Sequence, residues 1–182
     1  MLSHVNAVIE LEREHIGGGE EVTSNHKMRE AKLVEQRKQM DKKYMVQIID
    51  MLNRMEKRFG PGVYQVVEEA VVETTLAKWS EIARREESRT LADLIRLLWE
   101  PLKARGFEFS MEEKEDGIQV YCTKCALHDL AREIDGTNWM FYLKCASDPY
   151  IVQGFNPRIL FRRTKTLMEG HDCCDHFYGY VD

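Results

Sequence analysis

The hydrophobic period of this chain changes near Gly106, from about 3.6 residues before it to 2 residues after it. Upstream, apolar residues recur every three to five positions over long charged stretches, as they do in amphipathic helices. Downstream, Phe107, Phe109 and Met111 alternate with polar residues, which is the period of a half-buried strand. Because helices precede strands, we predict an α+β domain with N-terminal helices packed on a small antiparallel sheet.

Three helices are predicted before the change of period. The first covers residues 28–59 and the second residues 62–87. The third opens at a capping box in which Thr90 is paired with Asp93, and Pro101 should kink or end it near Trp99. The apolar face expected to pack in the second helix is Val63, Val67, Ala70, Thr74 and Ala77.

A β-hairpin and short helices are predicted after the change of period. Asp116-Gly117 is a hairpin turn signal between two alternating runs. Asp148-Pro149 is typical of an N-cap followed by the first helical position. The later elements are predicted as short helices over 124–135, 138–146 and 148–155 and strands over 158–166 and 173–181. Short helices are therefore inserted after the first hairpin.

Composition places the chain among globular proteins with one hydrophobic core. Its 182 residues suffice for a single domain, which we expect over 27–182, after a flexible N-terminal arm over 1–26 that contains three consecutive glycines. The net charge of −5 gives no general attraction to nucleic acid or to an anionic membrane. We expect no nucleic-acid or membrane partner, and the N-terminal helices are candidates for a homo-oligomer contact.

The cysteines indicate a reducing compartment. Five cysteines, an odd number, do not make a secreted disulfide framework, and there is no signal peptide or apolar run long enough to span a bilayer. We therefore predict a cytoplasmic protein whose thiols serve packing, metal binding or catalysis.

Chemically active side chains gather near the C-terminus. Six of the thirteen residues of 166–178 are Cys, His or Asp. In a strand, Cys174 and His176 share one face, with Cα atoms about 7 Å apart, so that both could contact one substrate. His171 falls in the turn before that strand.

Two further residues can be interpreted from their local sequence alone. With Thr123 as N-cap, Cys125 would lie in the first turn of a helix, where the macrodipole favours the thiolate and lowers the pKa. Asp148 is predicted as an N-cap or as a catalytic carboxylate.

Zinc is the alternative to catalysis: Cys122 and Cys125 form half of a metal knuckle that His171, Cys174 or His176 would complete. We expect no cofactor, with zinc as the alternative.

The C-terminal half also resembles a known family. The motifs that carry the likeness are Cys125, Cys145-x-x-Asp148, Asn156-Pro157 and Arg163-Thr164-x-Thr166-Leu167-x-x-Gly170-x-Asp172-x-Cys174-Asp175-His176-x-Tyr178. Over about residues 40–180 the chain resembles the L-2-amino-thiazoline-4-carboxylic acid hydrolase family. Cys122 and Cys173 are additions to its pattern. The resemblance carries over Cys125, Cys145, Asp148, Asn156, Cys174 and His176.

What the resemblance implies is a hydrolase that opens a cyclic amidine-like ring, in the namesake case 2-amino-thiazoline-4-carboxylate to N-carbamoyl-cysteine. A cysteine thiolate would attack C2, His176 or His171 would carry protons, and Asp148 would orient the imidazole. Arg163 is expected to hold a substrate carboxylate. Cys125, Cys145 and Cys174 stay open as nucleophiles. The alternative is a non-enzymatic sensor that binds a small molecule or zinc with the same residues.

Overall fold

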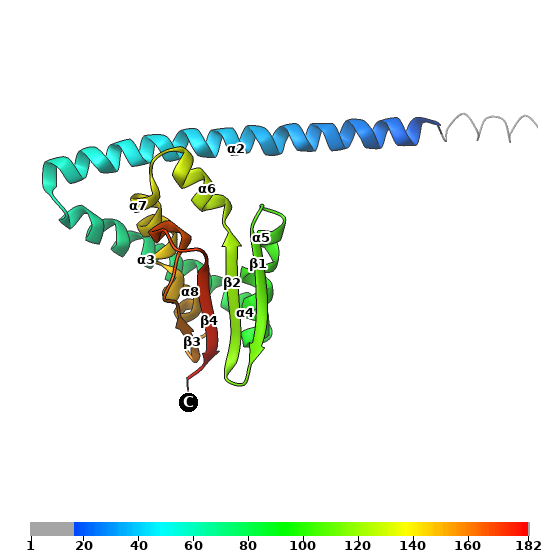
Figure 1. Ribbon diagram of the computed structural model, residues 1–182. Helices are drawn as coiled ribbons and strands as arrows, with labels where there is room; N and C mark the ends of the chain where they lie inside the picture. The colour runs from blue at the N-terminus through cyan, green and yellow to red at the C-terminus, as the bar shows by residue number, and fades with distance from the viewer. Residues whose placement is uncertain (1–16, 182) are drawn as a thin grey trace, which may run out of the picture. The chain divides into compact units, whose positions relative to one another are not determined.

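The structure is a computed structural model that describes residues 17–181 (Figure 1). The chain divides into two compact units between Met45 and Val46. In the first unit, the described residues belong to helix α2 (Gly17–Phe59), which continues into the second. The helix begins at Gly17, earlier than the predicted residue 28. Residues 1–16 of the predicted arm lie outside the described residues, and the proposed division at residue 26 stays a prediction.

The second unit carries the sheet and the remaining helices. Its helical elements after α2 are α3 (Gly62–Arg85), α4 (Leu91–Leu98), α5 (Glu100–Lys103), α6 (Ala126–Glu133), α7 (Thr137–Met140), the π-helical turn η1 (Phe141–Cys145), α8 (Asp148–Phe155) and the 3-10 turn η2 (Leu167–Glu169). Its strands are β1 (Glu108–Lys114), β2 (Gly117–Lys124), β3 (Ile159–Arg162) and β4 (Cys174–Tyr180).

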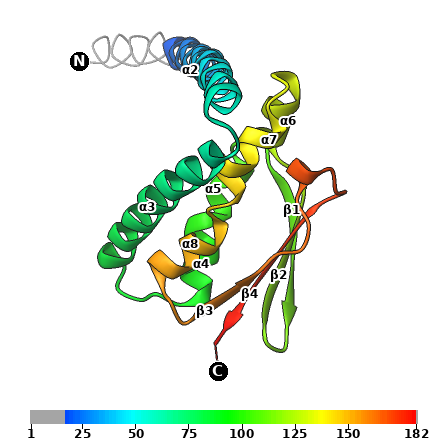
Figure 2. The same ribbon diagram turned by 90° about the vertical axis from the view of Figure 1, so that its left-hand side faces the viewer.

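The four strands form one antiparallel sheet in the order β1-β2-β4-β3. Helices α3, α4 and α8 lie on one side of it, and α6 and α7 lie at one end (Figure 2). The predicted α+β class, with helices first and short helices inserted after the hairpin, is confirmed. Strand β3 is shorter than predicted. No helix within residues 17–181 has the length and apolar character needed to cross a membrane.

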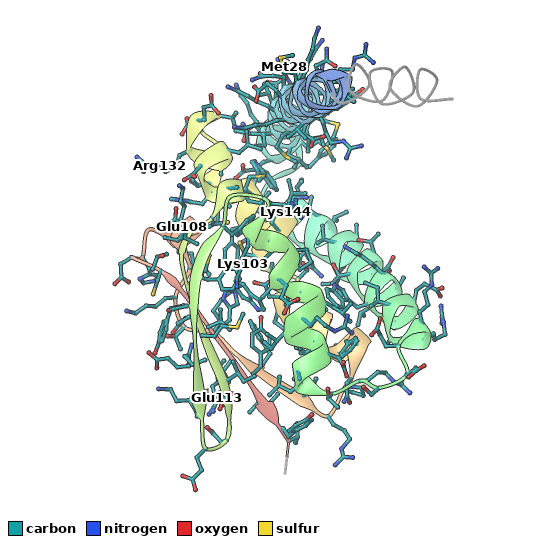
Figure 3. All side chains as sticks on the ribbon, turned by 90° about the vertical axis from the view of Figure 1, so that its right-hand side faces the viewer. Met28, Lys103, Glu108, Glu113, Arg132 and Lys144 are labelled. Carbon is teal, nitrogen blue, oxygen red and sulfur yellow. The ribbon has the colours of Figure 1, made fainter. Side chains whose placement is uncertain are left out.

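The local signals that start and stop elements are confirmed. Thr90 caps α4, and Asp93 completes the capping box by accepting the N–H of Thr90 at 3.0 Å. Pro101 falls at the start of α5, so the helical path is interrupted at Trp99, as predicted. The hairpin turn lies where Asp116-Gly117 predicts it, because Lys114 pairs with Gly117 across the two strands. Charged side chains such as Glu108 and Glu113 extend from β1 on the surface (Figure 3).

The packed face of α3 differs from the predicted one. Val63 is buried as expected, but Ala70, Thr74 and Ala77 are exposed. Trp79 and Ala83 are buried instead. The reason is the close approach of α8: a Cβ added at Gly154 would lie 3.0 Å from the carbonyl oxygen of Leu76 and from Cβ of Trp79. The position of α8, and not the period of α3 alone, selects the buried face.

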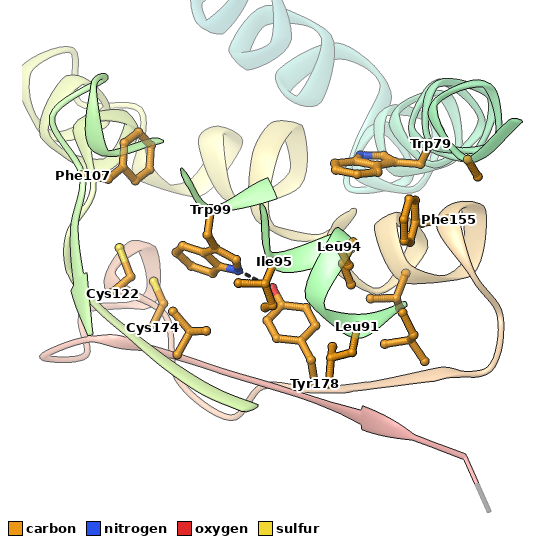
Figure 4. Packing of buried hydrophobic residues seen from close by; sticks show 14 of the residues in the cluster. Trp79, Leu91, Leu94, Ile95, Trp99, Phe107, Cys122, Phe155, Cys174 and Tyr178 are labelled. Carbon is orange, nitrogen blue, oxygen red and sulfur yellow. Dashed lines mark hydrogen bonds between the residues drawn. The ribbon is translucent and has the colours of Figure 1, made fainter. Parts of the chain in front are cut away.

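The core lies between the sheet and helices α3, α4 and α8 (Figure 4). Val120, Cys122, Cys174 and Tyr178 face it from the two central strands. Trp99 donates its indole N–H to the hydroxyl oxygen of Tyr178 at 3.2 Å, which satisfies two polar groups in an apolar interior. The same inner face of β4 carries His176, so the core and the chemically active residues share one surface of the sheet.

Candidate functional site

Asp148 joins two segments that are distant in sequence. It opens α8, and its Oδ2 lies 3.3 Å from Nε2 of His176 on β4. The same oxygen accepts a hydrogen bond from Nη1 of Arg163, and the two side chains form an ion pair. Arg163 is the first residue after β3. The three side chains are 20%, 9% and 11% exposed, respectively. The N-cap interpretation of Asp148 is wrong: Ser147 precedes the helix, and the Asp148 carboxylate is occupied by tertiary partners.

His176 is enclosed by aromatic rings. The Trp99 ring centroid lies 5.0 Å away in an edge-on arrangement, and that of Phe161 lies 5.8 Å away. Its Nδ1 is buried and has no hydrogen-bond partner among the described residues. A carboxylate only accepts hydrogen bonds, so in the neutral imidazole Nε2 donates to Asp148 and Nδ1 keeps a free lone pair. A buried acceptor of this kind is suited to take a proton from a thiol or water.

Cys145 lies beside this pair at the end of η1. Its carbonyl oxygen accepts a hydrogen bond from Nη1 of Arg163 at 3.0 Å. Burial, and then the negative charge of Asp148, raises the pKa of the Cys145 thiol, while the Arg163 charge opposes this. A π-helical turn adds one residue to a helix and is frequent at functional sites. Cys145 ends this turn, where the charges of both Asp148 and Arg163 act on its thiol.

Cys174 starts β4 on the same face as His176. Its Sγ accepts the backbone N–H of Leu167 at 3.3 Å. Burial raises the pKa of the Cys174 thiol to about 11, and that N–H acts in the opposite direction. Cys122 lies directly opposite on β2, where burial raises its pKa to about 12. The nearby Cys125 thiol also raises the pKa of Cys174, by less than burial does.

Cys125 does not have the lowered pKa that the sequence predicts. It is itself the N-cap of α6, in place of the predicted Thr123, and makes no capping hydrogen bond through its side chain. Burial raises the pKa of the Cys125 thiol, although the backbone N–H groups of Leu127 and His128 favour the thiolate. Desolvation therefore changes the pKa of Cys125 more than the N–H groups at the start of this short helix do.

Two predicted binding residues lie outside the Asp148–His176 contacts. Asn156 donates through Nδ2 to the carbonyl of Arg89 at 2.7 Å and accepts the N–H of Arg158, which fixes the turn into β3. His171 is exposed, and its backbone N–H is bound to the carbonyl of Thr166. The part of the chain that the structure describes contains no group of three or more His, Cys, Asp or Glu side chains arranged to hold a metal ion.

An open hollow of about 490 Å³ lies at the outer side of η2. It is lined by His128, Arg132, Asp135, Thr137, Leu167, Met168, Glu169 and Gly170. Leu167 is also the donor to Cys174, so one wall of the hollow touches the thiol. Glu169 accepts a hydrogen bond from the Thr166 hydroxyl, and Gly170 has φ of 89°, a left-handed conformation that closes the turn.

Sequence reasoning did not identify the aromatic walls or the hollow. Trp99 and Phe161 lie 77 and 15 residues from His176 in sequence, and only tertiary packing brings their rings against it. A signal for the hollow existed: Cys125, His128 and Arg132 recur at i, i+3 and i+7, the spacing of one helix face.

The fold and these contacts define an α+β protein with a buried carboxylate–imidazole pair and several thiols on the inner side of its sheet. The chain belongs to the L-2-amino-thiazoline-4-carboxylic acid hydrolase family, whose sequence profile matches residues 37–178. The resemblance noted from the motifs is thereby confirmed, and the family name is that of a hydrolase. None of the curated proteins compared matches the chain.

Seven chains of solved structures match this protein. One of them is the crystal structure of the phenol-responsive sensory domain of the transcription activator PoxR with phenol, with a TM-score of 0.48 and 10% sequence identity. The match covers 74% of this chain and 73% of that one.

Proposed function

We propose that this protein is a hydrolase that opens a small cyclic amidine-like heterocycle, 2-amino-thiazoline-4-carboxylate or a relative. Membership in the family supports the class of reaction. The observation that carries the proposal is the buried His176, whose Nε2 faces Asp148 while its Nδ1 has no partner among the described residues. An oriented imidazole with a free lone pair is the arrangement of a general base.

Cys174 is the nucleophile that we favour. It shares the inner face of β4 with His176, and the Leu167 N–H at its sulfur stabilises a developing thiolate. Because its pKa is raised, the resting group is a thiol, so attack requires a base to accept its proton. His176 provides that base. Cys145 is the alternative nucleophile, since it lies beside Asp148 and Arg163, and Cys125 is the third.

The reaction can be written with atoms in balance. The Cys174 sulfur attacks C2 of the ring while its proton passes to Nδ1 of His176, giving a tetrahedral adduct. The C2–S bond of the ring then breaks, and the imidazolium returns its proton to the leaving sulfur. Water, deprotonated by His176, attacks C2 of the isothiourea-like intermediate. The C2–S bond to Cys174 then breaks, and the imidazolium returns its proton to the Cys174 sulfur. The product is the N-carbamoyl thiol, formed by net addition of one water.

Asp148 and Arg163 are proposed as positioning residues. Asp148 orients His176 and stabilises its imidazolium form, as a carboxylate does in related triads. Arg163 holds Asp148 and the Cys145 carbonyl, so its donors are already directed at protein groups. The roles of Asn156 and His171 in binding substrate stay predictions.

The test is incubation of the full chain with 2-amino-thiazoline-4-carboxylate, with the ring-opened thiol followed by mass spectrometry. His176→Gln should remove turnover, whereas Lys78→Gln, which changes an exposed residue of α3 outside the site, should retain it. Equal turnover in the two variants would contradict the assignment of the base. Binding of the heterocycle without turnover by the unmodified protein would instead favour the sensor alternative.

We further propose self-association through the first unit. Among its described side chains, Met28, Leu33, Val34, Met40 and Tyr44 are more than half exposed. A helix segment that leaves such residues in water gains little stability by itself, and pairing with a second copy would cover them. We also propose a cytoplasmic location, because all five cysteines are free thiols.

A further inference from the structure

The hollow beside η2 is open to solvent and is lined by side chains of both charges. Arg132 projects from α6 (Figure 3), and Asp135 and Glu169 line the same space. No carboxylate of the described residues forms an ion pair with Arg132. Its guanidinium is therefore free to bind an anion, for which its planar donors are suited.

Asp135 is held in place by the backbone. It has φ of 51°, and its N–H donates to the carbonyl of Arg132 at 3.3 Å in the turn after α6. This left-handed conformation is tolerated by Asp and Asn better than by most residues. The turn thus sets a carboxylate and a guanidinium three residues apart on the rim of one hollow.

The hollow lies next to the thiols of the proposed reaction. Leu167 lines it and donates its N–H to Cys174. On the other wall, His128 and Arg132 continue the helix face that begins at Cys125. A small molecule in the hollow would therefore be separated from Cys174 by a single residue of η2.

We infer that this hollow recognises the charged groups of a small zwitterionic heterocycle, with Arg132 binding its carboxylate and Asp135 its protonated amidine. The inference rests on the proposed function, which supplies that substrate class. It reassigns carboxylate recognition from Arg163, which is mostly buried and bound to Asp148, to an arginine that is exposed and lines the hollow. Arg132 is then a specificity-determining residue.

The experiment compares two ligands that differ in one charge. Calorimetric binding of 2-amino-thiazoline-4-carboxylate and of 2-amino-thiazoline is measured on the full chain carrying Cys174→Ser, with and without Arg132→Gln. Loss of Arg132 should weaken binding of the carboxylate compound about tenfold and leave the other ligand unchanged. Arg158→Gln, which removes an exposed arginine in the turn before β3, is the matched control.

A second variant tests the other charge. Asp135→Asn keeps a residue type that tolerates the left-handed conformation but removes the carboxylate. Because both ligands carry the amidine, the affinity of both should fall by the same factor. Both effects should shrink at high ionic strength, since the hollow is open to solvent.

The outcomes separate the two hypotheses. Unchanged affinity for the carboxylate compound in Arg132→Gln, or no binding of either ligand at millimolar concentration, overturns the inference, even if the unmodified protein turns the compound over. Binding that depends on Arg132, together with no ring opening by the unmodified protein, supports the inference and removes the proposed hydrolysis.

Discussion

Cys173 and Cys174 are neighbours in sequence with opposite environments. Cys174 is 8% exposed and accepts the Leu167 N–H, whereas Cys173 is half-buried and lies just before β4. Successive side chains of a strand point to opposite faces, so one backbone position separates a thiol in the candidate site from one outside it. The two residues form a natural matched pair for mutation.

Replacing Cys174 with Ser should lower kcat/KM at least about a thousandfold, because a serine hydroxyl is a far weaker nucleophile than a thiol activated by His176. Cys173→Ser should keep the activity of the unmodified protein. Steady-state kinetics with 2-amino-thiazoline-4-carboxylate measures both. If Cys145→Ser is inactive and Cys174→Ser is active, the nucleophile is Cys145.

Asp148→Asn should destabilise the fold by about 3 kcal/mol, because it leaves the mostly buried guanidinium of Arg163 without a counter-charge. Urea unfolding measures this change. Glu86→Gln is the control: it removes the more exposed Arg96–Glu86 ion pair and should cost less than about 1 kcal/mol. Equal losses in the two variants would show that the Asp148 contact adds no more than a surface pair.

Alkaline pH should weaken the fold through its buried thiols. Burial raises the pKa of Cys174 to about 11 and that of Cys122 to about 12, above the value of about 8.5 for an unfolded cysteine. The unfolded chain therefore releases these protons first. Their contribution to stability is complete below pH about 8.5 and is lost as the pH rises through the folded values.

The measurement is the free energy of unfolding at pH 8, 9.5 and 11 for the unmodified protein and for Cys122→Ser, whose hydroxyl does not titrate. The decline should be less steep in the variant, since one of the thiols with a raised pKa is gone. Parallel declines would mean that the Cys122 thiol has the same pKa in the folded and unfolded chains.

Self-association should depend on apolar residues of the first unit. Met40→Glu with Tyr44→Glu should reduce the mass in solution to the 21.4 kDa of one chain, because two charges would lie in the proposed contact. Light scattering after size-exclusion chromatography measures it. Gln39→Glu, an exposed polar position on the same helix, should leave the mass unchanged. A single-chain mass for the unmodified protein would contradict the proposal.

Features set by neighbouring residues could be predicted from the sequence. The capping box of Thr90 and Asp93 and the hairpin turn at Gly117 each depend on residues within a few positions, and both are present. The change of period near Gly106 gave the α+β class for the same reason, since strand and helix periods are local properties.

Features set by distant partners could not be predicted. The period of α3 predicted that its face over residues 70–77 would pack, but that face is exposed. The buried face is selected by the approach of Gly154, which lies far along the chain and is not encoded in the period of α3. Asp148 fits a local N-cap pattern, yet its partners Arg163 and His176 are 15 and 28 residues away. For Cys125, the helix start is visible in sequence, but the burial that raises its pKa is tertiary.

The π-helical turn Phe141–Cys145 has an evolutionary consequence. One additional residue rotates the helical positions that follow it by about 100° relative to an α-helix. Deletion of a single codon within this turn would place a different residue beside Arg163, whose Nη1 binds the Cys145 carbonyl. Relatives with and without that extra residue would thus share a scaffold but diverge in chemistry.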